Sequence, residues 1–303
     1  MSRLITCDPQ FSIKLELDNP GGSHKYRAAS HIVARAIETG EIIPGRTTVI
    51  EKTGGNFGFG LLAACQKRNV DVALAIGLGF SQFKRDLLEG LGAELIGKAQ
   101  LREGATPREV IDHHLVHQHA LGRHYYYTDQ FNNTDNVQAH RSATGVELGR
   151  QLLSASASRR LLFVGCAGTG ASFTGVVQAL RDLDFDVRSI LVEPEGCDTL
   201  AEHFVDHRLE GMCVGVAPPF LDWTLVSDVY RAGLEDTITA QRRFYREQGF
   251  HVGNTTGACL AVAGQLRETA ALEGRHIVML GYDGGHWYPD LTRQMPTGAR
   301  NAA

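Results

Sequence analysis

The stretch LLFVGCAGTGASFTGVVQAL, residues 161–180, joins two apolar runs through a loop rich in glycine. The first run is short and ends at Gly165, which is typical of a buried strand, whereas the second has the length and the small first residues of a helix. Bare backbone amides at a helix start bind phosphate, so Gly168, Gly170 and Ser172 are candidate phosphate ligands. The alternative is a tight turn without a ligand. Either way, the stretch predicts the strand–loop–helix unit of a doubly wound α/β domain.

Strand and helix patterns alternate on both sides of this stretch. The expected strands are residues 47–51, 71–76, 93–97, 187–194 and 276–283, and the expected helices are residues 57–69, 81–92, 106–121, 137–153, 235–249 and 256–272. Two halves rich in such units predict two doubly wound α/β domains, with the loops at the carboxyl ends of their strands facing a shared crevice.

The composition limits the function classes. The chain has 303 residues, 43% of them hydrophobic, and a net charge of −4 from 30 basic and 34 acidic residues. This balance gives no basic surface for nucleic acid or for an anionic membrane, so a small molecule is the expected partner. No apolar run approaches the ~20 residues of a membrane span, and the first residues lack the apolar core of a signal peptide, so a cytoplasmic location is expected. The six cysteines lack the spacing of a disulfide framework or a zinc site.

Three further segments place polar groups at the start of a helix. HVGNTTGA, residues 251–258, places Thr255 before a helix of small residues, and NPGGSHKYRAA, residues 19–29, places Lys25 after a turn-rich loop. EKTGGNFG, residues 51–58, forms a second candidate anion site, for which a carboxylate is the natural ligand. Its candidate groups are the Thr53 hydroxyl and the amides of Gly54, Gly55 and Asn56. A simple helix cap by Asn56 is the alternative.

The glycine loop after Gly165 could bind a nucleotide instead of a single phosphate. Glu193 ends the next expected strand, about where the ribose-binding acid of a dinucleotide site would lie. However, Phe173 stands where GxGxxG requires its third glycine, and the loop lacks the lysine of GxxxxGK[ST]. A single phosphate therefore fits better.

Taken in order, seven segments resemble the cysteine synthase and cystathionine β-synthase family of fold-type II pyridoxal phosphate (PLP) enzymes, in the tryptophan synthase β-like superfamily. They are NPGGSHKYRAA, EKTGGNFG, DQFNN, GTGASFTGV, APPFLD, GNTTGA and YDGGHWY. The resemblance implies two doubly wound α/β domains with the cofactor in the interdomain crevice, and a homodimer. It also implies a larger PLP-binding domain at 1–29 and 141–303 and a smaller, mobile, substrate-closing domain at 30–140.

The resemblance also assigns a role to each motif. Lys25 looks like the Schiff-base lysine, which becomes a general base near the substrate Cα once the substrate amine displaces it. Thr255 would face the pyridine nitrogen, where a hydroxyl cannot hold a proton as an aspartate would, so β-elimination is favoured over transamination. The other cofactor contacts are assigned to Asn56, Gly168, Thr169, Gly170, Ala171 and Ser172. The substrate carboxylate is assigned to Thr53, Gly54, Gly55 and Gln130.

Four positions depart from the family pattern. Gly54 stands where the family usually has serine, and Phe57 stands where a small polar residue usually follows the asparagine. Both changes lie in the substrate loop, so they leave the substrate open. Thr255 replaces a more usual serine but keeps the hydroxyl, and Ala171 replaces a common glycine but keeps the backbone amide.

Together these features predict a PLP-dependent β-replacement enzyme of amino-acid biosynthesis. An O-activated serine, or a similar amino acid, would lose its β substituent to give an aminoacrylate, which a nucleophile then attacks; the leaving group and the nucleophile stay open. A serine or threonine dehydratase is the alternative enzyme. The alternative from another class is a non-catalytic PLP-fold binding or partner protein, which the joint presence of Lys25, Asn56 and Thr255 disfavours.

Two further features are assigned no chemistry. His113 and His117 lie one helical turn apart, but no HExxH and no third ligand accompany them, so no metal site is predicted. Asp283, Gly284 and Gly285 resemble the family's last strand and turn and are expected to form a wall of the cofactor pocket. No Gly-x-Ser-x-Gly motif supports a hydrolase.

Overall fold

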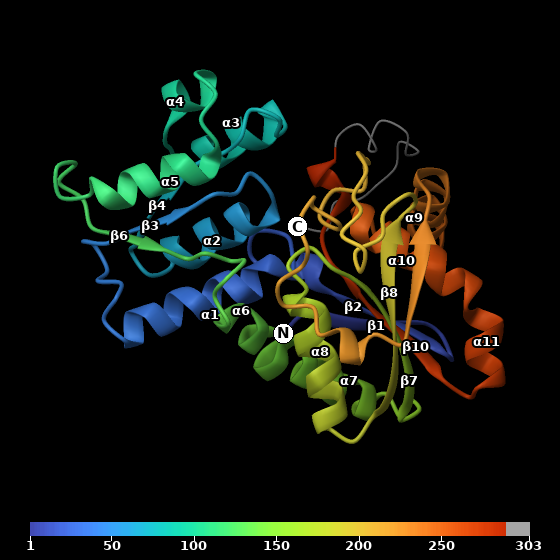
Figure 1. Cartoon of the computed structure of the whole chain (residues 1–303). Helices are drawn as coiled ribbons and strands as arrows, with labels where there is room; N and C mark the ends of the chain where they lie inside the picture. Colours follow the sequence, from blue (N-terminus) through green and yellow to red (C-terminus); the bar gives the residue numbers. More distant parts are fainter. Residues whose placement is uncertain (289–303) are drawn as a thin grey trace. The chain divides into compact units, whose positions relative to one another are not determined.

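Figure 1 shows the computed structural model of the chain, which describes residues 1–288. The chain forms two compact units. The first unit joins Met1–Asp18 to the chain from Val137 onward, and the second unit is the continuous segment Asn19–Asn136. The boundaries expected from the sequence differ from this division mainly in residues 19–29, which belong to the second unit.

The first unit is built on a sheet with the strand order β1-β2-β10-β7-β8-β9. β1 pairs with β2 in antiparallel orientation, and every other neighbouring pair in this sheet is parallel. The strands are β1 (Arg3–Asp8), β2 (Phe11–Leu15), β7 (Arg160–Cys166), β8 (Asp186–Pro194), β9 (Asp228–Ala232) and β10 (His276–Gly281). The main helices are α7 (Val146–Ser154), α8 (Ala171–Asp182), α9 (Leu234–Gln248), α10 (Asn254–Gln265) and α11 (Arg267–Leu272).

The stretch at residues 161–180 forms β7 and α8, as its pattern predicts. β7 is almost continuously apolar because helices cover the parallel sheet, and Phe163 and Val164 are fully buried. Phe163 meets Phe173 of α8 edge to face, with the ring centroids 5.6 Å apart. This packing fixes the start of α8, and with it the glycine loop, against the end of β7.

The second unit is a smaller parallel sheet with the strand order β5-β4-β3-β6. Its strands are β3 (Thr48–Glu51), β4 (Asp71–Leu74), β5 (Glu94–Leu95) and β6 (Tyr125–Tyr127). Its helices are α1 (Lys25–Glu38), α2 (Asn56–Gln66), α3 (Gln82–Gly90), α4 (Lys98–Arg102) and α5 (Pro107–Val116). In Figure 1, α1 and α2 lie side by side on this sheet. α2 is the helix that its nearly all-apolar sequence predicts to be buried, and most of its residues are buried.

The helix expected at 137–153 is broken into three parts. They are α6 (Asp135–Ala139), a π-helical segment η2 (His140–Gly145) and α7. α8 crosses this region at very close range: a Cβ on Gly175 would lie 2.7 Å from the Val137 carbonyl oxygen and 2.8 Å from the Arg141 nitrogen. Glycine at position 175 lets the two backbones approach, and the widened turn begins where they do.

Among residues 1–288, no helix combines the length and the apolar composition that a membrane span requires. All six cysteines are free, and five of them are buried.

Candidate active site

The loop after β7 contains two glycines, Gly168 and Gly170, at which neighbouring backbone atoms leave no room for a side chain. A Cβ on Gly168 would lie 2.7 Å from the Gly211 carbonyl oxygen, and one on Gly170 would lie 2.7 Å from the Leu221 Cα. Gly170 has φ +84°, which side-chain-bearing residues rarely adopt, and it is the N-cap of α8. No side chain caps α8 at this position, and the first amides of a helix have no partner inside it. The loop is therefore a backbone cradle suited to an anion.

A long connection between β8 and β9 holds this cradle from the other side. The Cys213 amide donates to the Ala167 carbonyl at 3.1 Å, and the Phe220 amide donates to the Thr169 carbonyl at 3.0 Å. Gly211, in the same connection, has φ +98°, and a Cβ there would lie 3.1 Å from the Thr255 Cγ2. Gly211 thus lies between the cradle and Thr255, and brings the two predicted cofactor contacts together within the first unit.

The two neighbouring threonines at the start of α10 have different surroundings. The Thr256 hydroxyl accepts a hydrogen bond from the Tyr282 amide at 2.9 Å, so it ties α10 to the end of β10. Thr255 is 6% exposed and lies against Gly211. The resemblance assigns Thr255 to the pyridine nitrogen, and the contact with the Tyr282 amide gives Thr256 a structural role instead.

In the second unit, Lys25 is the first residue of α1 and packs beside α2. A Cβ on Gly60 of α2 would lie 3.0 Å from the Lys25 carbonyl carbon and 2.8 Å from the Tyr26 nitrogen. A Cβ on Gly21, which has φ +76°, would lie 2.8 Å from the Phe59 carbonyl oxygen. These two close approaches clamp the loop before Lys25 onto the helix that begins at Asn56. Lys25 and Asn56 therefore occupy the starts of two adjacent helices.

The loop between β3 and α2 carries most of the predicted substrate contacts. Gly55 is the N-cap of α2 and Asn56 is its first helical residue, so Asn56 does not cap this helix. A Cβ on Gly54 would lie 2.5 Å from the Ile76 Cγ2 and 2.8 Å from the Phe80 Cγ. The departure from serine at position 54 therefore has a steric cause, because Ile76 and Phe80 fill the space that a side chain would need.

Gln130 follows β6 and Thr53 follows β3, and these strands are parallel neighbours. The carboxyl ends of parallel strands meet at one edge of a sheet, so both segments lie at the same edge. Thr53 is 9% exposed and Gln130 is 6% exposed. The structure therefore brings the predicted substrate residues together in the second unit.

Comparison with known proteins identifies the family. The family described as "Pyridoxal-phosphate dependent enzyme" matches residues 1–283 of this chain. The chain belongs to this family. Cysteine synthase from Staphylococcus aureus (strain N315) is 30% identical over 254 residues, which cover 83% of this chain and 78% of the relative. Probable cysteine synthase from Bacillus subtilis (strain 168) is 31% identical over 257 residues, covering 83% of this chain and 80% of the relative.

Solved structures agree with this assignment and with the predicted fold class. A crystal structure of O-ureido-L-serine synthase aligns with a TM-score of 0.83 at 26% identity, covering 98% of this chain and 94% of that chain. The O-acetylserine dependent cystathionine β-synthase from Helicobacter pylori aligns with a TM-score of 0.78 at 25% identity, covering 99% and 96%. The resemblance, the fold-type II α/β architecture and the PLP cofactor expected from the sequence are confirmed.

The residues of this PLP family member fit the cofactor. The phosphate of PLP requires a compact anion site, and the cradle at Gly168 and Gly170 presents backbone amides with no room for side chains. The cofactor also requires a primary amine, and Lys25 supplies one at the start of α1. The role of each individual residue remains a prediction.

Reasoning from sequence missed two residues that the structure makes prominent beside the predicted site residues. Gly211 lies in a segment with no recognised pattern, and its positive φ and its contacts with Gly168 and Thr255 are visible only in the fold. Glu51 ends β3 and is fully buried, although a glutamate beside a lysine in sequence suggests an exposed strand end. The motif APPFLD did mark the connection that contacts the cradle through Phe220 and Leu221.

Two other features lie outside these residues. The rings of His113 and His117 are 4.3 Å apart. Within the described part of the chain, however, no group of three or more His, Cys, Asp or Glu side chains is placed to bind a metal ion.

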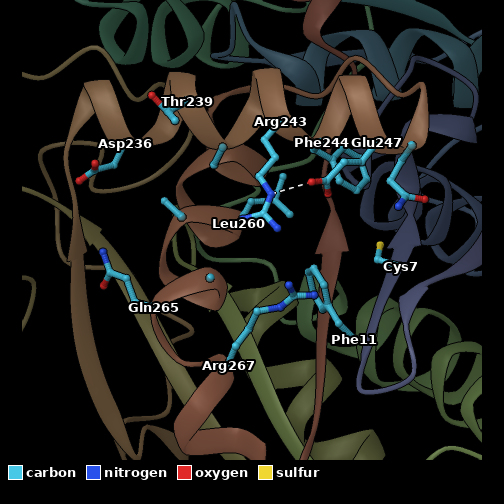
Figure 2. A pocket seen from close by; sticks show the side chains of 14 residues that line it. Cys7, Phe11, Asp236, Thr239, Arg243, Phe244, Glu247, Leu260, Gln265 and Arg267 are labelled. Atoms are coloured by element: carbon cyan, nitrogen blue, oxygen red, sulfur yellow. Dashed lines mark hydrogen bonds and ion pairs between the residues drawn. The ribbon is translucent and has the colours of Figure 1, made fainter.

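The first unit also has a pocket beside α9 and α10 with a volume of about 380 Å³, and Figure 2 shows the side chains that line it. Phe11 and Leu260 line it, and Arg243 pairs with Glu247 in its wall at 2.8 Å. None of the predicted site residues lines this pocket.

Proposed function

We propose that the protein is a PLP-dependent β-replacement enzyme that acts on an O-activated serine or a similar amino acid. The observation that carries the proposal is the position of Thr255, a residue with a neutral hydroxyl whose Cγ2 lies against Gly211, next to the glycine cradle. A neutral partner at the pyridine nitrogen leaves the ring a weaker electron sink than a carboxylate would, which favours loss of a β substituent over transamination.

The names of the relatives support the same reaction class. They include cysteine synthases, an O-ureido-L-serine synthase and an O-acetylserine dependent cystathionine β-synthase. All of these names refer to a serine derivative or to cysteine formation. The family match extends over residues 1–283, and therefore over every residue assigned a role in the proposed reaction.

Each unit would contribute distinct groups. When bound, PLP stabilises negative charge at the Cα of an amino acid. In the first unit, Gly168, Thr169, Gly170, Ala171 and Ser172 would hold its phosphate, and Thr255 would face its ring nitrogen. In the second unit, Lys25 would bind the cofactor carbonyl and then move the proton at the substrate Cα. Asn56 would donate to the ring hydroxyl.

The second unit would also bind the substrate carboxylate. Thr53 offers a hydroxyl, Gly54 and Gly55 offer backbone amides, and Gln130 offers its side-chain amide at the edge where β3 and β6 end. The amides of Gly54 and Gly55 precede the N-terminus of α2, whose dipole favours a negative charge. The protein would serve as a cytoplasmic homodimer, in which the second unit binds the substrate carboxylate and the first unit binds the cofactor phosphate.

The test is a product analysis of purified, PLP-loaded protein. With O-acetyl-L-serine or O-phospho-L-serine and a panel of sulfide, thiols and amines, we expect a replacement product whose formation depends on the added nucleophile. Without a nucleophile, release of keto acid and ammonia should be slow. Rapid conversion of serine or threonine to keto acid, with no replacement product across the panel, would instead establish the dehydratase. Absence of any turnover and of any spectral response to these amino acids would favour the non-catalytic alternative.

A further inference from the structure

The carboxyl group of Glu51 is the most deeply buried acidic group near the predicted substrate loop. Glu51 is the last residue of β3 and is fully buried. Its Oε1 accepts from the Lys52 amide at 2.9 Å. Its Oε2 accepts from the Thr128 hydroxyl at 2.5 Å and from the Gln130 amide at 3.2 Å. Burying a carboxylate is costly, and these three donors offset part of that cost.

These hydrogen bonds join two separate stretches of chain. Lys52 immediately precedes Thr53, in the loop that leads to Asn56, whereas Thr128 and Gln130 follow β6. Thr128 is fully buried, so solvent does not compete for its hydroxyl. A second link extends the junction: the Asn136 side-chain amide donates to the Gln130 carbonyl at 2.8 Å. Gln130 is thus held at both its amide and its carbonyl.

We propose that Glu51 is a positioning residue that sets the spacing between Thr53 and Gln130, the two side chains expected to contact the substrate carboxylate. The carboxyl group of Glu51 bridges the two segments, and it acts through them without touching the substrate. This inference deepens the proposed function and rests on it for the identity of the ligand. The bridge itself is a property of the second unit alone.

The chain offers a matched control at the other end of the same two strands. The Thr47 hydroxyl, just before β3, is hydrogen-bonded to the His124 Nδ1, just before β6, at 2.9 Å. Thr47 is 2% exposed. Thr47→Val and Thr128→Val therefore replace the same residue type at opposite ends of the β3–β6 strand pair. Only Thr128 contacts Glu51 and the predicted substrate segments.

The experiment compares Thr128→Val, Thr47→Val and Glu51→Gln in the PLP-loaded protein. With O-acetyl-L-serine as the probe, we expect Thr128→Val to raise KM about fivefold, the scale of one lost hydrogen bond, with little change in kcat. Glu51→Gln replaces one acceptor oxygen by a donor, which then faces donors, so its KM should rise by about tenfold or more. Thr47→Val also removes the acceptor of the Ile43 amide, so it should lower the melting temperature at least as much as Thr128→Val and leave KM unchanged.

Hydrogen exchange on the protein without substrate supplies a second readout. Thr128→Val and Glu51→Gln should both speed amide exchange in peptides covering residues 50–57 and 126–133, and Thr47→Val should not. Equal KM values for Thr128→Val and Thr47→Val, or unchanged exchange in both segments of Glu51→Gln, would overturn the positioning role. If wild-type protein neither binds nor converts O-acetyl-L-serine, the proposed substrate class is wrong, and the exchange comparison still decides whether Glu51 joins the two segments.

Discussion

The two units prepare their anion-binding groups in different ways. Around Gly168 and Gly170 the walls are backbone atoms that leave no room for a side chain, and the Ala171 amide donates to the Thr169 hydroxyl within the same loop. At the end of β3, a buried carboxyl group organises the binding segments through side-chain and backbone donors. The backbone cradle has no titratable group of its own, and a substitution that adds a side chain to one of its glycines should disrupt it. The carboxyl bridge should be disrupted by a substitution that removes one of its polar atoms, and its stability should depend on pH.

The largest expected effect tests whether the second unit carries the reactive amine. Lys25→Ala should abolish the visible absorption of the lysine-bound cofactor and lower turnover by at least about 10³-fold, because no other amine replaces it at the start of α1. Borohydride reduction of the wild-type protein followed by peptide mass spectrometry should find PLP on Lys25. PLP on Lys14, Lys52 or Lys84 would refute the assignment. Lys98→Ala, at an exposed lysine paired with Glu89, is the control and should behave as wild type.

Adding one carbon atom to the cradle should have the next largest effect. In Gly170→Ala, the new Cβ meets the backbone of Leu221 and the residue must keep φ +84°, so we expect a loss of about 4 kcal/mol, shared between folding and PLP affinity. Gly264→Ala in α10 is the matched control, since its Cβ would meet nothing within 4 Å and alanine favours a helix by about 1 kcal/mol. Wild-type PLP affinity and stability in Gly170→Ala would show that backbone does not limit this cradle.

The carboxyl bridge should make stability depend on pH. Burial is the largest influence on the pKa of Glu51 and raises it, the hydrogen bonds from Thr128, Lys52 and Gln130 lower it, and the charge of Asp129 raises it; together they raise this pKa from 4.5 to about 7. Because the native state binds the extra proton between these two values, the contribution of Glu51 to the free energy of unfolding is fully present below pH 4.5 and is lost as the pH rises through 7. This one group accounts for about 3 kcal/mol of that decrease.

Urea unfolding at several pH values checks this contribution. Glu51→Gln has no proton to lose, so it should be more destabilising relative to wild type at pH 5 than at pH 8, by about 2.5 kcal/mol. Tyr127 and Asp129 face the same carboxyl group and stay in place in this variant. A parallel pH dependence in wild type and Glu51→Gln would mean that another group titrates. Glu89→Gln, at an exposed carboxylate, is the control.

The substrate loop has its own steric limit, which a double substitution can test. Gly54→Ser restores the residue usual in the family but drives its Cβ against Ile76 and Phe80, so we expect a loss of about 2 kcal/mol in substrate binding or stability. Phe80→Ala should relieve part of this loss, because the ring of Phe80 is 45% exposed and leaves room when it is removed. Additive effects of the two substitutions would show that Phe80 is not the obstacle.

The smallest expected effect separates the two threonines at the start of α10. Thr255→Val should weaken PLP binding by about 1 kcal/mol and shift the cofactor spectrum, since it removes one hydrogen bond. Thr256→Val should instead lower stability and leave the spectrum unchanged, because the Thr256 hydroxyl contacts the Tyr282 amide. If the spectra respond in the opposite order, Thr256 is the residue at the ring nitrogen.

Local patterns predicted the parts of the fold that are locally determined. The apolar run and glycine loop at residues 161–180 specify β7 and α8 because strand, turn and helix each follow from adjacent residues. β6 was missed because it has just three residues, Tyr125–Tyr127, and lies at the edge of its sheet, beside β3. β2 was missed because Lys14 interrupts its apolar pattern. Lys14 is fully buried and forms an ion pair with Glu147 of α7 at 2.5 Å, a partner that no sequence window contains.

The candidate site divides in the same way. Residues inside a motif, such as Lys25, Asn56 and Gly170, could be named from the sequence because the motif fixes their position on a helix start. Gly211 lies outside every motif, and Glu51 lies inside EKTGGNFG but has no role that the motif assigns. Glu51 accepts a hydrogen bond from Thr128, which is 77 residues away in the chain. Gly211 packs against Gly168 and Thr255. Their roles arise from contacts between distant segments.

The pairing of β2 with β10 has a consequence for synthesis on the ribosome. Phe11 lies opposite Ile277, so a strand made among the first residues must wait for one made near the end of the described chain. At about 5–20 residues per second, this wait lasts on the order of tens of seconds. The continuous segment Asn19–Asn136 can complete its own sheet long before then. During that interval the hairpin of β1 and β2 exposes an unpaired edge, which makes the nascent chain a client for chaperones that cover such edges.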